Sequence, residues 1–494
     1  MATGEHLDPT SEISLEAVKS RAVKGVVVLT GRTFLLSVLS LAATGFLTVF
    51  LEPAEFGVFW IVSAIVNFLA YFSDVGLAAA LIQKKEVPEE KDLRTTFLIQ
   101  QVLVIILLLI LFFLTPTLTR IYNLSPEGTF LLYALGISLL LSSLKTIPSV
   151  LLERELEFGK LVLPQILENL AYNITAVILA WKGFGVTSFS IAILVRGMIG
   201  LSAIYFLKPW VPGFALSRAS LKKLLSYGVP YQANTLLATL KDDGMTVVLG
   251  TILGPAGIGL LGWAQKWAYA PLRFFMDHVL KVTFPAFARM QDAKEDLRRS
   301  VSRSIFFICF FVFPTLAGLL ILAPILVAII PRYEKWGPAL IALSLIGINT
   351  IFAAVTTPLT NLLNAIGKIK ITFKLMIMWT VLTWLLVPAL ALKYGINGAA
   401  LGYALVGGSS VIAVYIARRF VKFSLLESVI RPLAASLVMA IALFFVRGFV
   451  PSSLTSVWFL IALGIAIYAV SIYLIIGVSI VSDVKRSIST FFSK

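Results

Sequence analysis

Charged side chains occur inside long apolar runs of this chain, where each needs a chemical or structural reason to be present. They are eight basic and five acidic residues: Arg32, Lys145, Arg196, Lys241, Lys266, Arg273, Lys281 and Lys374, and Asp74, Glu168, Asp242, Asp243 and Asp277. A charge inside a membrane is costly, so such residues face a partner or a water-filled cavity. Arg and Lys bind phosphate through charge-assisted hydrogen bonds. The excess of basic residues therefore favours an anionic ligand.

Helical spacing places these charges on the same helix faces as other polar residues. Lys266, Arg273 and Asp277 are spaced i, i+7 and i+11, and Trp263 and Trp267 flank them. Two further stripes are Trp60, Ser63, Asn67, Tyr71 and Asp74, and Gln165, Glu168 and Tyr172. Such stripes predict helices that line a wet, polar chamber. The alternative is pairing between helices, for example Arg32 with Asp242 or Lys241 with Asp74.

The elements that carry these residues are apolar helices. Of the 494 residues 59% are hydrophobic and 13% are charged, whereas soluble domains are about 45–50% apolar and 25% charged. This composition excludes a soluble enzyme, a disordered chain and a nucleic-acid-binding domain. The apolar runs are 26–50, 56–82, 96–116, 128–150, 161–181, 186–207, 224–250, 257–283, 302–330, 337–363, 370–391, 397–418, 431–449 and 455–478. Each can cross a bilayer core of about 30 Å, so we predict an all-α membrane protein with about fourteen transmembrane helices.

The basic residues of the loops give the orientation. One set of alternate loops carries 27 Lys and Arg, and the other set carries 6. The positive-inside rule therefore predicts that both termini are cytoplasmic. The outer loops are too short for an extracytoplasmic catalytic domain, and no phosphate-binding loop is present, so we expect a protein that is not an enzyme. The single cysteine, Cys309, and the two histidines leave no basis for a disulfide, a metal site or a cofactor.

An internal duplication organises the chain. Leu51–Gly57 matches Leu253–Gly259, Asp74 matches Asp277, and five more matches follow in order at a similar offset. A repeat of six spans predicts two parallel copies around a central cavity, related by a pseudo-two-fold axis along the membrane normal. The predicted parts are a cytoplasmic segment 1–25, an N-lobe 26–209, a cytoplasmic linker 210–223, a C-lobe 224–420, a helix pair 421–480 and a cytoplasmic tail 481–494.

Several segments resemble one known family. They are Lys241-Asp242-Asp243 through Leu249-Gly250, Leu253–Gly259, Pro271, Phe284–Asp292 and the linker Glu153–Lys160. These resemble the bacterial polysaccharide (O-antigen and exopolysaccharide) flippases of the multidrug/oligosaccharidyl-lipid/polysaccharide exporter superfamily, and the resemblance covers about residues 26–425. It implies two six-helix lobes, alternating access, a polyprenyl-pyrophosphate-linked oligosaccharide as cargo and no covalent catalytic step. The extra helix pair resembles the lipid II flippase branch.

Together these observations predict a flippase of the cytoplasmic membrane that acts in cell-surface polysaccharide synthesis. The predicted substrate-binding residues are Arg32, Lys145, Arg196, Lys241, Lys266 and Arg273, with Trp263, Trp267, Asn67 and Tyr71. The predicted coupling or ion-pairing residues are Asp74, Glu168, Asp242, Asp243 and Asp277. Expected partners are the lipid-linked glycan, membrane lipid, H⁺ or Na⁺ and polysaccharide-assembly proteins, with no nucleic acid, and the expected state is a monomer. The alternatives are a multidrug or organic-cation antiporter, a lipid II-type flippase, and a scaffold without transport.

Cysteine labelling tests the predicted orientation. In a Cys309→Ser background, a Leu253→Cys variant is expected to react with a membrane-impermeant thiol reagent from outside, because the distribution of basic residues places residues 250–257 and 331–336 outside. Labelling only from the cytoplasmic side would invert the predicted topology.

Overall fold

The computed structural model describes residues 15–476. Side chains are described for residues 31–475, apart from those at positions 227, 230, 231, 233–235, 237, 238, 277, 278, 281 and 282. Residues 1–14 of the predicted segment 1–25, and the whole predicted tail 481–494, lie outside the described residues. Within the described part every regular element is helical, which confirms the predicted fold class.

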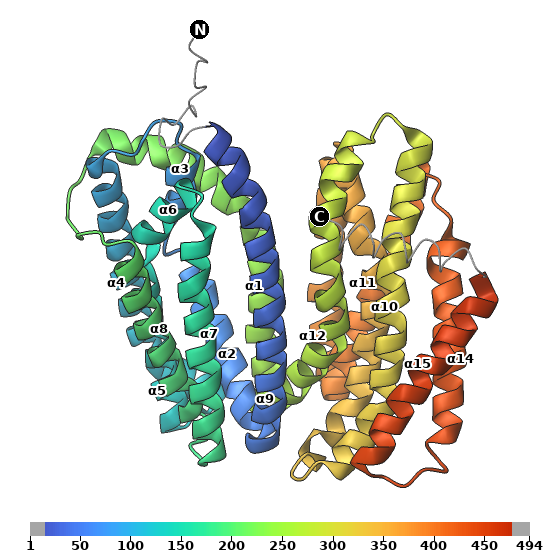
Figure 1. Ribbon diagram of the computed structural model, residues 1–494. Helices are drawn as coiled ribbons and strands as arrows, with labels where there is room; N and C mark the ends of the chain where they lie inside the picture. Colours follow the sequence, from blue (N-terminus) through green and yellow to red (C-terminus); the bar gives the residue numbers. More distant parts are fainter. Residues whose placement is uncertain (1–14, 477–494) are drawn as a thin grey trace. The chain divides into compact units, whose positions relative to one another are not determined.

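The chain divides into two compact units, one up to Gly259 and one from Leu260 onward, here called unit 1 and unit 2. Unit 1 contains α1 (Leu15–Phe50), α2 (Pro53–Ala70), α3 (Leu77–Gln83), α4 (Glu90–Tyr122), α5 (Pro126–Leu144), α6 (Thr146–Arg154), α7 (Phe158–Trp181), α8 (Thr187–Leu207) and the first part of α9 (Arg218–Arg289). Within this unit α7 packs against both α1 and α8, and α8 also packs against α5 (Figure 1).

Unit 2 contains the rest of α9 and the remaining helices. These are α10 (Lys294–Ile329), the short 3₁₀ helix η1 (Glu334–Ala339), α11 (Leu340–Ala365), α12 (Ile369–Gly408), α13 (Val411–Phe420), the π-helical turn η2 (Leu426–Ile430), α14 (Arg431–Val446) and α15 (Leu454–Ile476). The last two helices pack on α10 through a core that includes Leu322, Met439, Leu443 and Leu460. The predicted C-terminal helix pair is thus part of unit 2.

Twelve helical segments among the described residues are long and apolar enough to cross a membrane. The predicted count of fourteen is not confirmed, because two pairs of predicted spans lie in continuous helical segments, Thr239–Met276 and Ile369–Phe420. Each segment has one non-helical residue, Gly254 (φ 66°) in α9 and Gly395 (φ 60°) in α12. Glycine tolerates positive φ. A single glycine therefore interrupts each helix where the sequence predicts a short loop.

Local sequence fixes where several helices begin. Pro53 lies in the first turn of α2, where its missing N–H costs nothing. Glu52 and Glu55 form a capping box there, and Glu89 and Asp92 form another at the start of α4. Ser125 accepts a hydrogen bond from the Gly128 N–H at the start of α5. Helices that start at defined residues place their interior side chains at defined heights.

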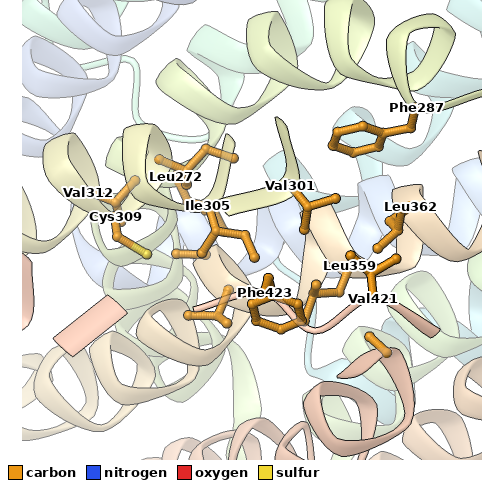
Figure 2. Packing of buried hydrophobic residues seen from close by; sticks show 14 of the residues in the cluster. Leu272, Phe287, Val301, Ile305, Cys309, Val312, Leu359, Leu362, Val421 and Phe423 are labelled. Carbon is orange, nitrogen blue, oxygen red and sulfur yellow. The ribbon is translucent and has the colours of Figure 1, made fainter. Parts of the chain in front are cut away.

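The core of unit 2 joins the second part of α9 to α10 and α11. Figure 2 shows Leu272 of α9 packed with α10 residues that include Ile305 and Cys309, together with Leu359 of α11 and Phe423. Cys309 is completely buried. This core fixes how α9 is rotated within unit 2.

A smaller core joins four helices of unit 1. Leu81 of α3, Phe97 of α4, Ile147 of α6 and Leu224 of α9 are all buried in it. The first part of α9, which follows the predicted linker 210–223 in the sequence, is therefore packed into unit 1. The predicted lobe boundaries stay a prediction.

Arg154 at the end of α6 closes this core with hydrogen bonds to backbone carbonyls. Its guanidinium donates to the carbonyl oxygens of Leu81 and Lys84 at 2.7 Å and to that of Ile82 at 3.0 Å. The last carbonyls of a helix have no partner within the helix, so Arg154 caps the C-terminal turn of α3. It thereby attaches the α3–α4 connection to α6.

Replacing this arginine is expected to destabilise unit 1. Arg154→Met removes a charged donor and leaves buried carbonyls unsatisfied, which costs about 3 kcal/mol. The thermal unfolding midpoint of the purified protein in detergent measures the effect. Arg154→Lys should recover part of the stability, because a single ammonium keeps the charge but lacks the planar fork.

Lys91→Met is the matched control, since Lys91 is exposed and its ion pair is with the exposed Glu89. That change is expected to stay within about 0.5 kcal/mol of the wild type. Equal midpoints for Arg154→Met and Lys91→Met would show that Arg154 does not stabilise the unit.

Candidate functional site

Three predicted site residues meet in the interior of unit 1. The Nζ of Lys145 lies 2.5 Å from Glu168 Oε1, and the Nε of Arg196 lies 3.7 Å from Glu168 Oε2. Glu168 is buried in the middle of α7, whereas the Arg196 side chain on α8 is 54% exposed. Two cations share one carboxylate, so the cluster has an excess positive charge, and Arg196 is the member accessible to a ligand.

The position of Lys145 results from a break between α5 and α6. The regular helix ends at Leu144, and its carbonyl accepts a hydrogen bond from the Tyr205 hydroxyl of α8 at 3.0 Å. On the other side of the break, Gln100 donates to Thr146 Oγ1 at 2.9 Å. Backbone groups freed inside a membrane are tolerated where polar side chains satisfy them. The break therefore gives Lys145 a polar environment.

Gly200 makes room for the carboxylate of Glu168. A Cβ atom at position 200 of α8 would lie 1.7 Å from Glu168 Oε1 and 2.3 Å from its Cδ. Only glycine lets α8 approach this closely. This residue could not be found from the sequence, because a glycine in an apolar run carries no signal of its own until its neighbour is known.

Lys266 and Arg273 lie on the face of α9 opposite the side that packs into unit 2. Ala264, Ala268 and Leu272 are buried, and at about 100° per residue they cover one side of the helix. Lys266 and Arg273 fall within about 20° of each other on the other side. Arg273 is exposed, Lys266 is half-buried, and their charges repel each other. An anion that contacts both side chains would relieve this repulsion.

The two predicted aromatic ligands beside this stripe differ in environment. Trp263 is 4% exposed, stacks on Trp336 and donates from Nε1 to the Tyr333 hydroxyl at 3.1 Å. Its ring is covered in this structure, so it has no free face for a sugar here. Trp267 is half-buried, and its Nε1 is buried with no hydrogen-bond partner among the described residues. Of the two rings, that of Trp267 is the one that is partly exposed, although its indole N–H is enclosed.

The predicted polar residues of α2 lie beside the first part of α9. Asn67 lies next to Asp243, close enough for a hydrogen bond between their side chains. The Tyr71 hydroxyl donates to the backbone carbonyl of Gln232, whose Nε2 donates back to the Tyr71 carbonyl at 2.5 Å. These contacts join α2 and the residue that follows it to α9 within unit 1. Of the two predicted ligands, Asn67 is exposed and Tyr71 is half-buried.

The remaining predicted residues are distributed over unit 1 and α9. Asp74 accepts hydrogen bonds from the Ala78 N–H at the start of α3, at 3.2 and 3.3 Å. Lys241 lies 3.2 Å from its neighbour Asp242. Arg32 of α1 has its Nε buried without a hydrogen-bond partner in the described part of the chain. The side chain of Asp277 lies outside the described residues, and among the described ones no group of acidic, His and Cys residues could hold a metal.

A substitution of Gly200 tests how the cluster is held together. Gly200→Ala forces the Glu168 carboxylate away from Lys145, and separating a buried ion pair is strongly destabilising, here by about 2 kcal/mol. The thermal unfolding midpoint should fall. In a Glu168→Ala background the same change should cost much less, because the clash is gone.

Gly318→Ala is the control, since a Cβ there meets nothing within 4 Å. It is expected to be neutral or slightly stabilising, because alanine favours helix. If Gly200→Ala matched Gly318→Ala, Gly200 would not be needed for the cluster.

Comparisons with known proteins place this chain among proteins of polysaccharide biosynthesis. A family model described as "Polysaccharide biosynthesis protein" matches residues 46–340. The chain is 25% identical over 371 residues to the lipopolysaccharide biosynthesis protein WzxC of Escherichia coli (strain K12), covering 74% of each chain. It is also 25% identical over 441 residues to the succinoglycan biosynthesis transport protein ExoT of Rhizobium meliloti (strain 1021), covering 86% of this chain and 87% of that one.

Solved structures show the same fold. The lipid II flippase MurJ in an inward closed conformation has a TM-score of 0.75 at 16% identity, covering 91% of this chain and 98% of that chain. An inward-facing multidrug resistance MATE family transporter of the MOP superfamily has a TM-score of 0.61 at 18% identity, covering 80% of this chain and 98% of that chain. The fold is therefore that of multi-pass membrane transporters. The family model matches more than half of the length of this chain, so the chain belongs to the polysaccharide biosynthesis protein family.

Proposed function

We propose that this protein moves a polyprenyl-pyrophosphate-linked oligosaccharide across the cytoplasmic membrane by alternating access, for cell-surface polysaccharide synthesis. The observation that carries the proposal is the family match over residues 46–340 in a chain with the fold of a lipid-linked precursor flippase. The names of WzxC and ExoT, in lipopolysaccharide biosynthesis and succinoglycan transport, support the same class of cargo.

The physical difficulty of this reaction is the headgroup. Taking the pyrophosphate oxygens and the many sugar hydroxyls through hydrocarbon would strip them of water without replacing their hydrogen bonds. Basic side chains at membrane depth lower that barrier by replacing the hydration shell with charge-assisted hydrogen bonds. The lipid tail stays in the hydrocarbon throughout, so only the headgroup needs a protein pathway.

We assign the pyrophosphate to Arg273 and Lys266 first. They share a face of α9, they are separated by about 10 Å along the helix axis, and their mutual repulsion favours an anion beside them. Arg196, Arg32, Lys145 and Lys241 are the further basic residues of the pathway. Trp267 and Asn67 are suited to sugar hydroxyls and rings, as half-buried or exposed side chains with hydrogen-bonding groups.

The acidic residues have a second role in this proposal. Glu168 holds Lys145 and Arg196 when cargo is absent and competes with the cargo's phosphates for them. Asp74, Asp242, Asp243 and Asp277 are the candidates for taking up a coupling H⁺ or Na⁺. The protein works as a monomer in the inner membrane with both termini in the cytoplasm, supplied by polysaccharide-assembly proteins.

The alternatives differ in the sign of the ligand's charge or in its headgroup. An organic-cation antiporter needs an acidic pathway, and the excess of basic residues opposes it. A lipid II-type flippase carries the same pyrophosphate on a different glycan, and the similarity of fold to MurJ, with α14 and α15 present, favours it as the second candidate. Complementation separates the two: the chain should restore surface polysaccharide to a strain that lacks a polysaccharide flippase, but it should not replace a missing lipid II flippase.

Arg273 is the residue whose replacement tests the proposal. In a strain that lacks the chromosomal copy, Arg273→Ala is expected to abolish surface polysaccharide while protein level and thermal stability stay unchanged, because the exposed side chain contributes nothing to the core. Arg273→Lys should restore part of the export, since the charge remains but the bidentate fork is removed. Surface polysaccharide is measured against membrane protein level by immunoblot.

Arg298→Ala is the matched control, because Arg298 is an exposed arginine that pairs with Glu295 at the start of α10. It should export normally. Normal export by Arg273→Ala would remove the pyrophosphate assignment from this residue.

A further inference from the structure

Two segments of the internal duplication contact each other. Leu51–Gly57 and Leu253–Gly259 share four residues in register, namely leucine, proline, alanine and glycine. In both, proline lies at the start of a helical stretch, and glycine follows four residues later, one turn further along. Pro53 thus corresponds to Pro255, and Gly57 corresponds to Gly259.

The contact between these segments is reciprocal. A Cβ atom at Gly57 would lie 1.6 Å from the carbonyl oxygen of Pro255, and one at Gly259 would lie 1.7 Å from the carbonyl oxygen of Pro53. In both cases the same Cβ atom would lie 2.5 Å from the carbonyl carbon of that proline. When residue i touches j and the counterpart of i touches the counterpart of j, the contact lies on a two-fold axis. A local two-fold axis that relates these two segments therefore passes through the contact, within unit 1.

The contact is made by backbone at its centre and is sealed by apolar side chains beside it. Glycine in both helices lets the two backbones approach closely. Next to it, a Cβ at Gly250 would lie 3.1 Å from Ile61, which is completely buried, and 3.0 Å from the ring of Tyr122. The Tyr122 hydroxyl donates to the Val247 carbonyl at 3.1 Å. At this level α2 and α9 leave no room for a side chain at Gly57 or Gly259, and so none for cargo.

We propose that the reciprocal contact of Gly57 and Gly259 with Pro255 and Pro53 closes the transport pathway on the side of residues 250–257. It parts in each cycle to let the headgroup through. This inference rests on the transport function proposed above and adds the residues on which closure depends. The two glycines are related by the axis, so they can separate symmetrically. The dispersion attraction between each pair of their atoms is weak. The contact therefore excludes solutes when it is closed and yet opens readily.

A disulfide across the closed contact tests whether it must open. The chosen pair is Ile61→Cys with Gly250→Cys. A Cβ at position 250 would lie 3.1 Å from Cγ1 of Ile61, the atom that the sulfur of a cysteine at position 61 would replace, and this spacing suits a disulfide. Oxidation of membranes carrying the full-length double variant should cross-link most molecules, scored by peptide mass spectrometry. On oxidation of the double variant, surface polysaccharide export should fall at least tenfold and recover with reductant, whereas the same oxidation should leave export by the wild type, which has Cys309 alone, unchanged.

Full cross-linking with unchanged export would overturn the proposal, and so would failure of the cross-link to form. Export by the wild-type gene is measured in parallel. If the wild type restores no polysaccharide, it is the proposed function that fails, and the cross-link yield still reports on the contact itself.

Alanine at each glycine tests the symmetry directly. Gly57→Ala and Gly259→Ala, placed in the double-cysteine protein, should each lower the cross-link yield at least fivefold and to a similar extent, because either side chain prevents closure. Gly318→Ala should leave the yield unchanged. A full yield in either variant, or a reduced yield in only one of them, would refute closure by a two-fold contact.

Discussion

A charge within the hydrocarbon layer is stable only where a partner or water replaces its hydration shell. This constraint explains the most detailed feature of unit 1. Glu168 is buried in the middle of α7 and held by Lys145 and Arg196. The helix break at Lys145, the Tyr205 hydrogen bond to the freed Leu144 carbonyl and the space left by Gly200 all serve to place that carboxylate. In unit 2 the same constraint keeps Lys266 and Arg273 on the side of α9 away from the buried core.

The proposed function depends on basic residues whose charge the neighbouring carboxylates neutralise only in part. One carboxylate for two cations leaves Arg196 loosely held, at 3.7 Å and largely exposed. Arg273 is exposed next to a second cation on the same helix face. The residual positive charge suits the pyrophosphate of the proposed cargo, and the chain belongs to a family of polysaccharide biosynthesis proteins.

The sequence predicts the helical class and most of the elements, because twenty-residue apolar runs admit no other structure in lipid. It could not predict that Gly254 and Gly395 interrupt helices as single residues, since a short loop and a sharp break have the same local composition. Spacing correctly places Lys266 and Arg273 on one face, because helical periodicity alone decides it. The burial of Trp263 under Tyr333 and Trp336 depends on contacts between segments far apart in sequence, as does the need for glycine at position 200. The repeat in Leu51–Gly57 and Leu253–Gly259 was visible in the sequence, but only the structure shows that the two copies touch.

The proposed transport requires that the basic residues recognise the phosphate-bearing headgroup. Binding of a polyprenyl pyrophosphate and of the matching uncharged polyprenol to the purified full-length protein tests it most directly, measured by native mass spectrometry in the same detergent. The wild type should retain the pyrophosphate at least tenfold better than the alcohol, and a Lys266→Ala/Arg273→Ala double variant should lose that preference while still binding the alcohol. Equal retention of the two lipids by the wild type, or an unchanged preference in the double variant, would show that these residues do not recognise the pyrophosphate.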